Sequence, residues 1–290
     1  MTVINTNTAA TITANALTKN ERAMSQAMER LSTGVRINNA GDDAAGLAIS
    51  SRMTSQIKGL DMAVRNANDA ISMIQTVDGA AIEITNMLQR MRELRVQAAS
   101  GTMSSTDVTA LDTEFLQLLA QIDDIASDTT WNGVAVMSGG ASVGDYGKFS
   151  FQVGANASQT IDVNFGDWNL AAAGTATAYV ASTSANDSLG RNLSAYNVND
   201  TSIIDNLTST IDDVNTARAT YGAVINRLEY AADNLANVSQ NTSASRSRVL
   251  DADYASETTE LARTQIIQQA ATAMLSQANQ QAQSVLALLK

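Results

Sequence analysis

The chain has 290 residues, of which 44% are hydrophobic and 4% aromatic, and its formal net charge at neutral pH is −11. Such an acidic chain lacks the clustered Lys and Arg that nucleic acid and anionic membranes require, so neither is the expected partner. Cysteine, histidine and proline are all absent. Disulfides, thiol nucleophiles, the commonest metal ligand and the usual general base are therefore excluded. We expect no enzyme activity, no cofactor and no metal site.

The missing proline favours long helices, because proline normally makes up about 5% of residues and disrupts helix interiors. The apolar residues are mostly Ala, Leu, Ile, Val and Met, which suit narrow seams between helices. The first twenty residues lack the basic and apolar regions of a secretory signal, and no run reaches the ~20 apolar residues of a membrane span. The composition predicts an elongated, mainly helical protein with no membrane span.

The first predicted helix covers residues from about 10 to 33 and carries an apolar stripe. Leu17, Met24, Met28 and Leu31 follow one another at helical spacing. Gly34 is expected to end this helix, because glycine readily adopts the left-handed conformation found at helix C-termini.

An irregular segment, "GVRINNAGDDAAG", follows over residues 34–46 and contains Gly34, Gly41 and Gly46. Glycine permits positive φ, and Asn and Asp side chains bond to nearby backbone. Asp42 and Asp43 stand where the first turn of the next helix favours acids, since its amide groups are unpaired there. The segment is predicted to join two helices; the simpler alternative is an ordinary interhelical loop.

Three further elements are predicted between residues 53 and 165. A second apolar stripe begins at Met53 and continues to Ala98, and after a turn at "SGTMSSTD" a third runs from Val108 to Ile125, folding back as a hairpin. From about residue 131 the pattern changes, and apolar and polar residues alternate on both sides of "GANAS". This alternation predicts a β-hairpin whose inward residues are Phe149, Phe151 and Val153 on one strand and Ile161, Val163 and Phe165 on the other.

Helical spacing returns between Ile204 and Leu235, where Arg218 is the one stripe residue out of character. A returning joint, "RSRVLDADYASE", is predicted at residues 246–257, and a last stripe runs from Tyr254 to Leu289. The predicted fold is mainly α: long antiparallel coiled-coil helical rods with a small β-hairpin region, and paired N- and C-terminal helices.

Three segments resemble bacterial flagellin: "LSTGVRINNAGDDAAGLAIS", "LQRMRELRVQAASGT" and "SRSRVLDADYASETTELARTQIIQQA". The resemblance covers roughly residues 1–165 and 200–290. It implies an inner terminal coiled-coil domain over 1–44 and 250–290 that forms the filament core. A helical rod domain with the β-hairpin would cover 45–165 and 200–249, and a short exposed variable excursion would cover 166–199.

The function implied by this resemblance is that of a structural subunit of the bacterial flagellar filament. The chain would be exported unfolded through the flagellar type III apparatus and would self-assemble outside the cell into a helical tubular filament used for swimming. Its implied partners are other copies of itself, an export chaperone, and the cap and hook-junction proteins. Physically, an isolated pair of terminal helices has no core beneath it, so we expect it to be disordered in the monomer and to fold on packing.

The resemblance also implies roles for particular residues. The interdomain joint would contain Gly34, Gly41, Asp42, Asp43 and Gly46, and filament-core packing would use Leu17, Met24, Met28, Leu31, Leu261, Ile267, Met274, Val285, Leu286 and Leu289. Arg90, Leu94 and Glu114 match positions through which animal Toll-like receptors bind flagellin, on a surface that also contacts the adjacent protofilament. The C-terminal leucines match those read by cytosolic innate receptors.

Two other functions stay open at this point. A hook–filament junction protein shares the architecture but forms a short adaptor and does not polymerise alone. A secreted coiled-coil effector or adhesin would bind a host receptor and stay monomeric. Bulk polymerisation separates the filament subunit from both alternatives.

Overall fold

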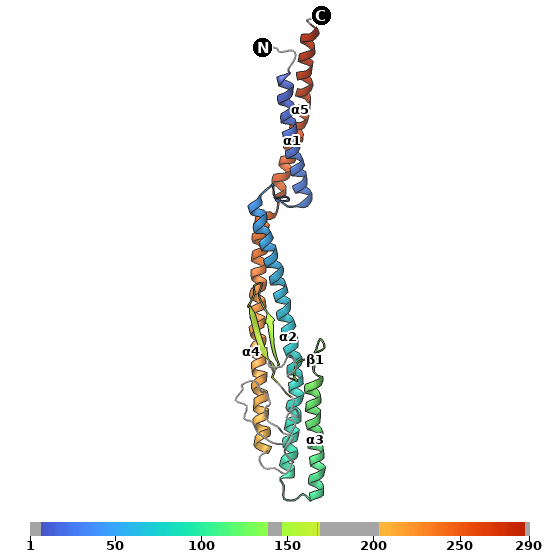
Figure 1. The fold of residues 1–290 in the computed structure, drawn as a ribbon, viewed down its shortest axis with the longest axis vertical. Coiled ribbons are helices and arrows are strands. Elements are labelled where there is room, and N and C mark those ends of the chain that lie inside the picture. Colours follow the sequence, from blue (N-terminus) through green and yellow to red (C-terminus); the bar gives the residue numbers. More distant parts are fainter. Residues whose placement is uncertain (1–6, 139–146, 167, 169–202, 288–290) are drawn as a thin grey trace. The chain divides into compact units, whose positions relative to one another are not determined.

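The computed structural model describes residues 7–138, 147–166, 168 and 203–287. Within these ranges the chain is mainly helical, which confirms the predicted fold class (Figure 1). The elements are α1 (Thr8–Thr33), α2 (Ala44–Ala98), α3 (Ser105–Asp128), β1 (Thr130–Trp131), β2 (Val134–Ala135), β3 (Lys148–Gln152), β4 (Thr160–Asn164), α4 (Ile203–Leu250) and α5 (Tyr254–Ala287).

The ends of the first helix follow from its capping residues. The side chain of Asn7 accepts a hydrogen bond from the backbone N–H of Ala10 at 3.0 Å, which satisfies one of the unpaired amides of the first turn. At the other end Gly34 has a φ of 70°, and its N–H bonds to the carbonyl of Arg30. The predicted glycine stop is therefore confirmed.

The returning joint is shorter than predicted, because α4 continues through residues 246–250 and ends at Leu250. Only Asp251–Asp253 separate it from α5, which begins at Tyr254. No glycine or proline stands between Arg246 and Leu250, so nothing in that stretch interrupts helical hydrogen bonding. The apolar stripe of α4 is interrupted by polar residues before this point, so the stripe did not predict where the helix ends.

The chain folds into two compact units, one assembled from the two ends of the chain and the other from the continuous segment between them. One unit comprises Met1–Ile57 with Gln240–Lys290, and the other comprises Lys58–Ser239. The predicted domain boundaries near residues 44 and 250 fall at helix ends, and that division stays a prediction. The excursion predicted over 166–199 lies outside the described residues except for Gly166 and Trp168.

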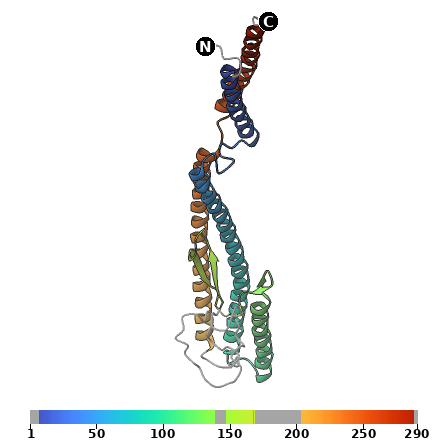
Figure 2. The ribbon, with the colours of Figure 1, turned by 45° about the horizontal axis from the view of Figure 1, so that its top comes forward.

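The unit from Lys58 to Ser239 has a continuous apolar core. Helix α3 lies alongside α2 in both views, and its capping box at Ser104 and Asp107 fixes where it starts (Figures 1 and 2). Helices α2 and α4 are antiparallel, since Asp78 and Arg92 of α2 bond to Arg218 and Thr208 of α4. The residues of α2 with 0% exposure are Ala67, Ala70, Ile74, Val77, Ala81, Ile84, Leu88, Met91 and Leu94.

Arg218, which interrupted the apolar stripe, has a structural partner. Its Nε donates to Oδ1 of Asp78 at 2.7 Å, and the two side chains are about one-third exposed. A cation at this position is therefore paired across the α2–α4 seam. The long stripe of α4 tolerates it because the partner carboxylate lies at the same level of α2.

The predicted hairpin is confirmed, with β3 and β4 antiparallel in the register Phe149 to Val163 and Phe151 to Ile161. After β4, the carbonyl of Phe165 accepts hydrogen bonds from Trp168 Nε1 at 2.6 Å and from the hydroxyl of Tyr221 at 3.0 Å. The rings of Phe165 and Tyr221 lie 5.6 Å apart. These contacts attach the hairpin to α4.

A second hairpin, β1–β2, escaped sequence analysis. Its turn is Asn132–Gly133, and both residues have positive φ, 50° and 79°. Asn-Gly between short β-prone runs is a strong hairpin signal, because the turn that matches strand twist needs positive φ at both positions. The sequence "WNGV" was therefore sufficient to predict this hairpin.

Candidate functional site

The strongest candidate surface belongs to the antiparallel pair of α1 and α5, which lie side by side in both views (Figures 1 and 2). The seam between them buries small and polar side chains rather than large apolar ones. Ala27 is 2% exposed and Thr264 is 1% exposed. Buried Asn20 donates from Nδ2 to the carbonyl of Thr264 at 2.8 Å. Small residues let the two backbones approach closely.

Two more polar contacts tie the same pair near its ends. Asn7 donates from Nδ2 to the carbonyl of Ala278 at 3.1 Å. Arg30 forms an ion pair with Glu257 at 3.1 Å. Together with Asn20 and Thr264, these contacts place the N-cap Asn7 and residues 20 and 30 of α1 opposite residues 278, 264 and 257 of α5. A directional bond at each level specifies one register, which an alanine-rich apolar seam alone does not.

Large apolar side chains of this pair point away from the seam. Ile12 is 69% exposed, Ile266 is 66% exposed and Met274 is 63% exposed. Met28 and Ile267 are exposed as well. Exposed apolar residues are ordinary when they occur singly, but several on one thin helix pair indicate a surface that packs against something else.

The residues predicted for core packing divide into three groups. Leu17, Met24, Leu31 and Leu261 are half-buried beside the α1–α5 seam, whereas Met28, Ile267 and Met274 are exposed. Val285 and Leu286 lie within helix α5, and Leu289 lies outside the described residues. Sequence reasoning missed Asn20 and Thr264 because it searched for apolar residues; Asn20 lies three residues after Leu17 and four before Met24, at seam spacing.

The two connectors of this unit are hydrogen-bonded to each other. Val35 and Asp251 form an antiparallel bridge. The N–H of Arg36 donates to the carbonyl of Leu250 at 2.7 Å, and the N–H of Ala252 donates to the carbonyl of Gly34 at 3.0 Å. The segment after α1 is therefore held by the segment before α5.

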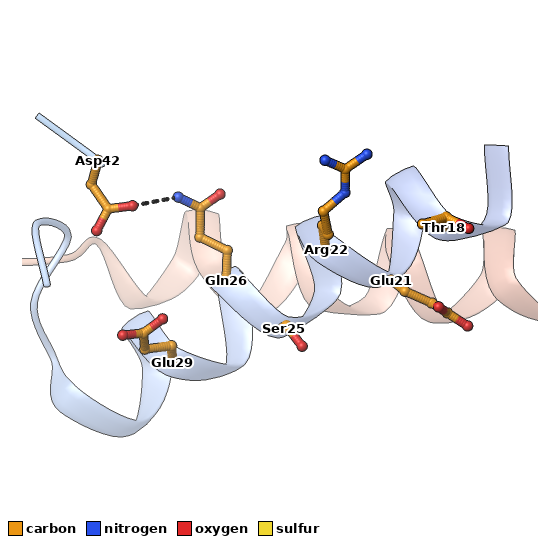
Figure 3. A pocket seen from close by; sticks show the side chains of 7 residues that line it. All are labelled: Thr18, Glu21, Arg22, Ser25, Gln26, Glu29 and Asp42. Atoms are coloured by element: carbon orange, nitrogen blue, oxygen red, sulfur yellow. Dashed lines mark hydrogen bonds between the residues drawn. The ribbon is translucent and has the colours of Figure 1, made fainter. Parts of the chain in front are cut away.

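The two adjacent acids of the connector have separate structural roles. Asp43 caps α2, since its Oδ1 accepts from the N–H of Gly46 at 2.8 Å. Asp42 Oδ2 accepts from the N–H groups of Asn38 and Asn39, and its Oδ1 accepts from Gln26 (Figure 3). These donors, Asn39 foremost, hold the pKa of the Asp42 carboxyl below its usual range, because they stabilise the charged form.

The three predicted joint glycines differ in what requires them. Gly34 needs its positive φ. At Gly46, a Cβ would lie 2.6 Å from Cδ1 of buried Ile37 and 2.5 Å from the Asp43 carboxylate. At Gly41, a Cβ would meet nothing within 4 Å, and φ is not positive. Gly41 therefore has no steric requirement of this kind.

A hollow of about 470 Å³ lies over the outer face of α1, beneath Asp42. Thr18, Glu21, Arg22, Ser25, Gln26, Glu29 and Asp42 line it. Figure 3 shows Glu21 and Arg22 extending in opposite directions from the helix, so these side chains do not converge on one point. In the part of the chain that the structure describes, no group of three or more Asp and Glu residues is arranged to hold a metal ion.

The predicted receptor surface lies on α2 and α3. Arg90 Nη2 forms an ion pair with Glu114 at 2.8 Å and Nη1 forms one with Glu93 at 3.2 Å. All three charged side chains are exposed, but Leu94 is fully buried in the core. A partner that docks here meets Arg90 and Glu114, whereas Leu94 supports the surface from beneath. Arg95 is also buried.

Among residues 7–138, 147–166, 168 and 203–287, no helix has the length and apolar character needed to cross a membrane.

Comparisons with known proteins match both ends of the chain. The bacterial flagellin N-terminal helical region matches residues 4–142, and the bacterial flagellin C-terminal helical region matches residues 204–289. A flagellin from Bacillus subtilis strain 168 is 43% identical, with 99% of each chain covered. The flagellar filament 33 kDa core protein of Treponema phagedenis is 37% identical over 99% of this chain and 100% of its own length. The crystal structure of Bacillus cereus flagellin is 30% identical over 59% of this chain and 88% of that one, with a TM-score of 0.45. The two matched family regions and the B. subtilis relative show that the chain belongs to the bacterial flagellin family.

Proposed function

We propose that this chain is the structural subunit of a bacterial flagellar filament and that the α1–α5 pair packs in the filament core. Family membership supports the filament role, and the T. phagedenis relative is itself named a filament core protein. The observation that carries the packing role is the exposure of large apolar side chains on a pair whose own seam is small and polar.

The physical reason is that a single α1–α5 pair has little buried apolar surface of its own, and packing against neighbouring subunits supplies this burial. Each Å² of apolar surface removed from water stabilises by ~25 cal/mol, and Ile12, Ile266 and Met274 present such surface outside the seam. Contacts between unlike faces that do not close into a ring generate an open helical polymer. Repetition along the polymer lets each subunit pack against several others.

The connectors fit this role as the interdomain joint. Gly34 turns the chain out of α1, and Asp42 and Asp43 fix the path into α2. The backbone hydrogen bonds between residues 34–36 and 250–252 hold the connector after α1 against the connector before α5. We infer that subunits in one filament share this local geometry because it is held by hydrogen bonds within each chain.

We also propose where the chain works and which proteins it meets. The filament lies outside the cell, and the chain reaches it by flagellar type III export with the help of a chaperone, a cap and hook-junction proteins. The exposed Arg90–Glu114 pair is proposed as a second contact surface, toward an adjacent protofilament or a host innate receptor. Its support is the resemblance together with the exposure of both charges.

The packing role is tested by making the outer face of α5 polar in the full chain. We expect Ile267→Gln to slow filament growth from seeds roughly tenfold, because a buried amide without partners costs about 1–3 kcal/mol. Ile82→Gln is the matched control, since Ile82 is 40% exposed and Ile267 is 42% exposed. Growth is measured by light scattering and electron microscopy. Equal loss from both substitutions would contradict a special role of the terminal pair.

A further inference from the structure

Methionine carries all the sulfur of this chain, which has 11 methionines and no cysteine. Met73, Met91 and Met137 are buried in the core of the Lys58–Ser239 unit. Among the described residues, three methionines are strongly exposed: Met28 at 54%, Met62 at 47% and Met274 at 63%. Two of these three lie on the α1–α5 pair.

We propose that Met28 and Met274 are oxidation sites that control assembly: conversion of their thioethers to sulfoxides in the unassembled subunit slows filament growth. The reagent class is a two-electron oxygen donor such as hydrogen peroxide. This inference rests on the proposed function, since it requires the outer faces of α1 and α5 to be buried between subunits.

The chemistry needs nothing beyond the side chain and the oxidant. The Sδ lone pair attacks one oxygen of hydrogen peroxide, so the S–O bond forms as the O–O bond breaks. The departing hydroxide takes the proton from the transferred oxygen and leaves as water. Sulfur is oxidised by two electrons and the peroxide is reduced by two. The product is a polar sulfoxide in place of a flexible apolar side chain.

The position of the two residues makes the effect specific to assembly. Met28 follows Ala27, which occupies the α1–α5 seam, and Met28 itself points outside it. Met274 precedes half-buried Leu275 and is likewise outside the seam. Oxidation of either side chain therefore leaves the internal contacts of the pair, including the Asn20 bond to Thr264, in place.

In the filament the same sulfoxide would be buried. A polar S=O group that enters an apolar interface without a hydrogen-bond donor opposes packing. Ile267, which lies seven residues before Met274 on the same face of α5, offers no donor from its side chain. Assembly in turn shields both sulfurs from oxidant. The subunit is therefore sensitive before assembly and protected after it, and sulfoxide reduction restores it.

The experiment compares full-length subunits and preformed filaments treated with hydrogen peroxide. Peptide mass spectrometry measures sulfoxide at each methionine, with Met62 as the internal control of similar exposure. We expect Met28 and Met274 to oxidise roughly tenfold more slowly in filaments than in free subunits. Equal rates at these two positions in both states would overturn the proposal.

The second measurement is seeded growth of treated subunits. We expect oxidised wild type to grow roughly tenfold more slowly than untreated protein, and the Met28→Leu/Met274→Leu double variant to grow equally with and without treatment. Met62→Leu is the control and should stay sensitive. Circular dichroism checks that oxidised subunits keep the helicity of untreated ones; loss of helicity would overturn the surface mechanism.

The outcomes separate this inference from the function on which it rests. If untreated subunits grow and oxidised subunits grow equally well, the oxidation proposal fails and the filament role stands. If untreated full-length subunits do not grow from seeds of their own filaments, both fail together.

Discussion

Single polar residues determine how the terminal helices pair. Asn20, Thr264, Arg30 and Glu257 each contribute a directional contact between α1 and α5. The fully buried positions of the seam are small or polar, and the large apolar residues beside it are only half-buried, so the directional polar bonds select the register. Other large apolar residues, such as Ile12, Ile266 and Met274, remain exposed outside the seam.

Ionisation of Tyr221 is expected to change the stability of the Lys58–Ser239 unit at high pH. Burial raises the pKa of its hydroxyl well above the ordinary value, since the anion is disfavoured in the core. Because the pKa is higher in the folded chain than in the unfolded chain, the neutral Tyr221 hydroxyl contributes its full stabilisation below the unfolded pKa of about 10. This contribution to the free energy of unfolding is lost as the pH rises above about 10 toward the folded pKa. We therefore expect the free energy of unfolding to fall more steeply above about pH 10 in wild type than in Tyr221→Phe.

At neutral pH the same variant tests the hydrogen bond to Phe165. Removing the hydroxyl leaves a carbonyl that still accepts from Trp168, so we expect a loss of about 1 kcal/mol, measured by urea denaturation. Identical alkaline slopes for the variant and wild type would show that Tyr221 does not control the pH response.

At the scale of elements, the connector between α1 and α2 is defined by one left-handed residue. Gly34 has a φ of 70°, which an L-residue adopts at a cost of about 1–2 kcal/mol. We expect Gly34→Ala to lower the free energy of unfolding by that amount. Gly41→Ala is the matched control and should be neutral or slightly stabilising, because its Cβ would have open space. Urea denaturation of both variants distinguishes these results, and equal effects would contradict the assigned role of φ.

Periodicity was enough to predict most elements. The three-four spacing of α1, α2, α3 and α4 and the alternation of β3 and β4 each reflect a single buried face, so these elements were readable from sequence. The end of α4 was not, because residues 236–250 contain mostly polar side chains. The seam of α5 was also unreadable, since its buried contact, Thr264, is polar and its exposed Ile267 and Met274 satisfy the same spacing.

At the scale of the whole molecule, the two compact units differ in what their interiors contain. The Lys58–Ser239 unit buries large residues such as Phe115, Leu88 and Tyr221. The other unit buries few large side chains among those described, and its paired helices depend on small and polar contacts. Their local stabilities should differ accordingly.

Hydrogen exchange on unassembled full-length subunits measures this difference. We expect amides of α1 and α5 to exchange at least roughly tenfold faster than amides over residues 74–94 of α2, since their opening exposes less apolar surface. Free exchange throughout α1 and α5 would mean that this pair is disordered until it packs, as the sequence predicts. Protection equal to that of α2 would contradict both expectations.

The central claim, that the terminal helices drive filament formation, is tested most directly by electron microscopy of seeded growth. The full chain is compared with a chain that lacks residues 1–33 and 255–290, and circular dichroism verifies that the shortened chain stays helical. We predict long filaments from the full chain alone. Filaments from both chains, or a full chain that stays monomeric on seeds of its own filament, would contradict the account.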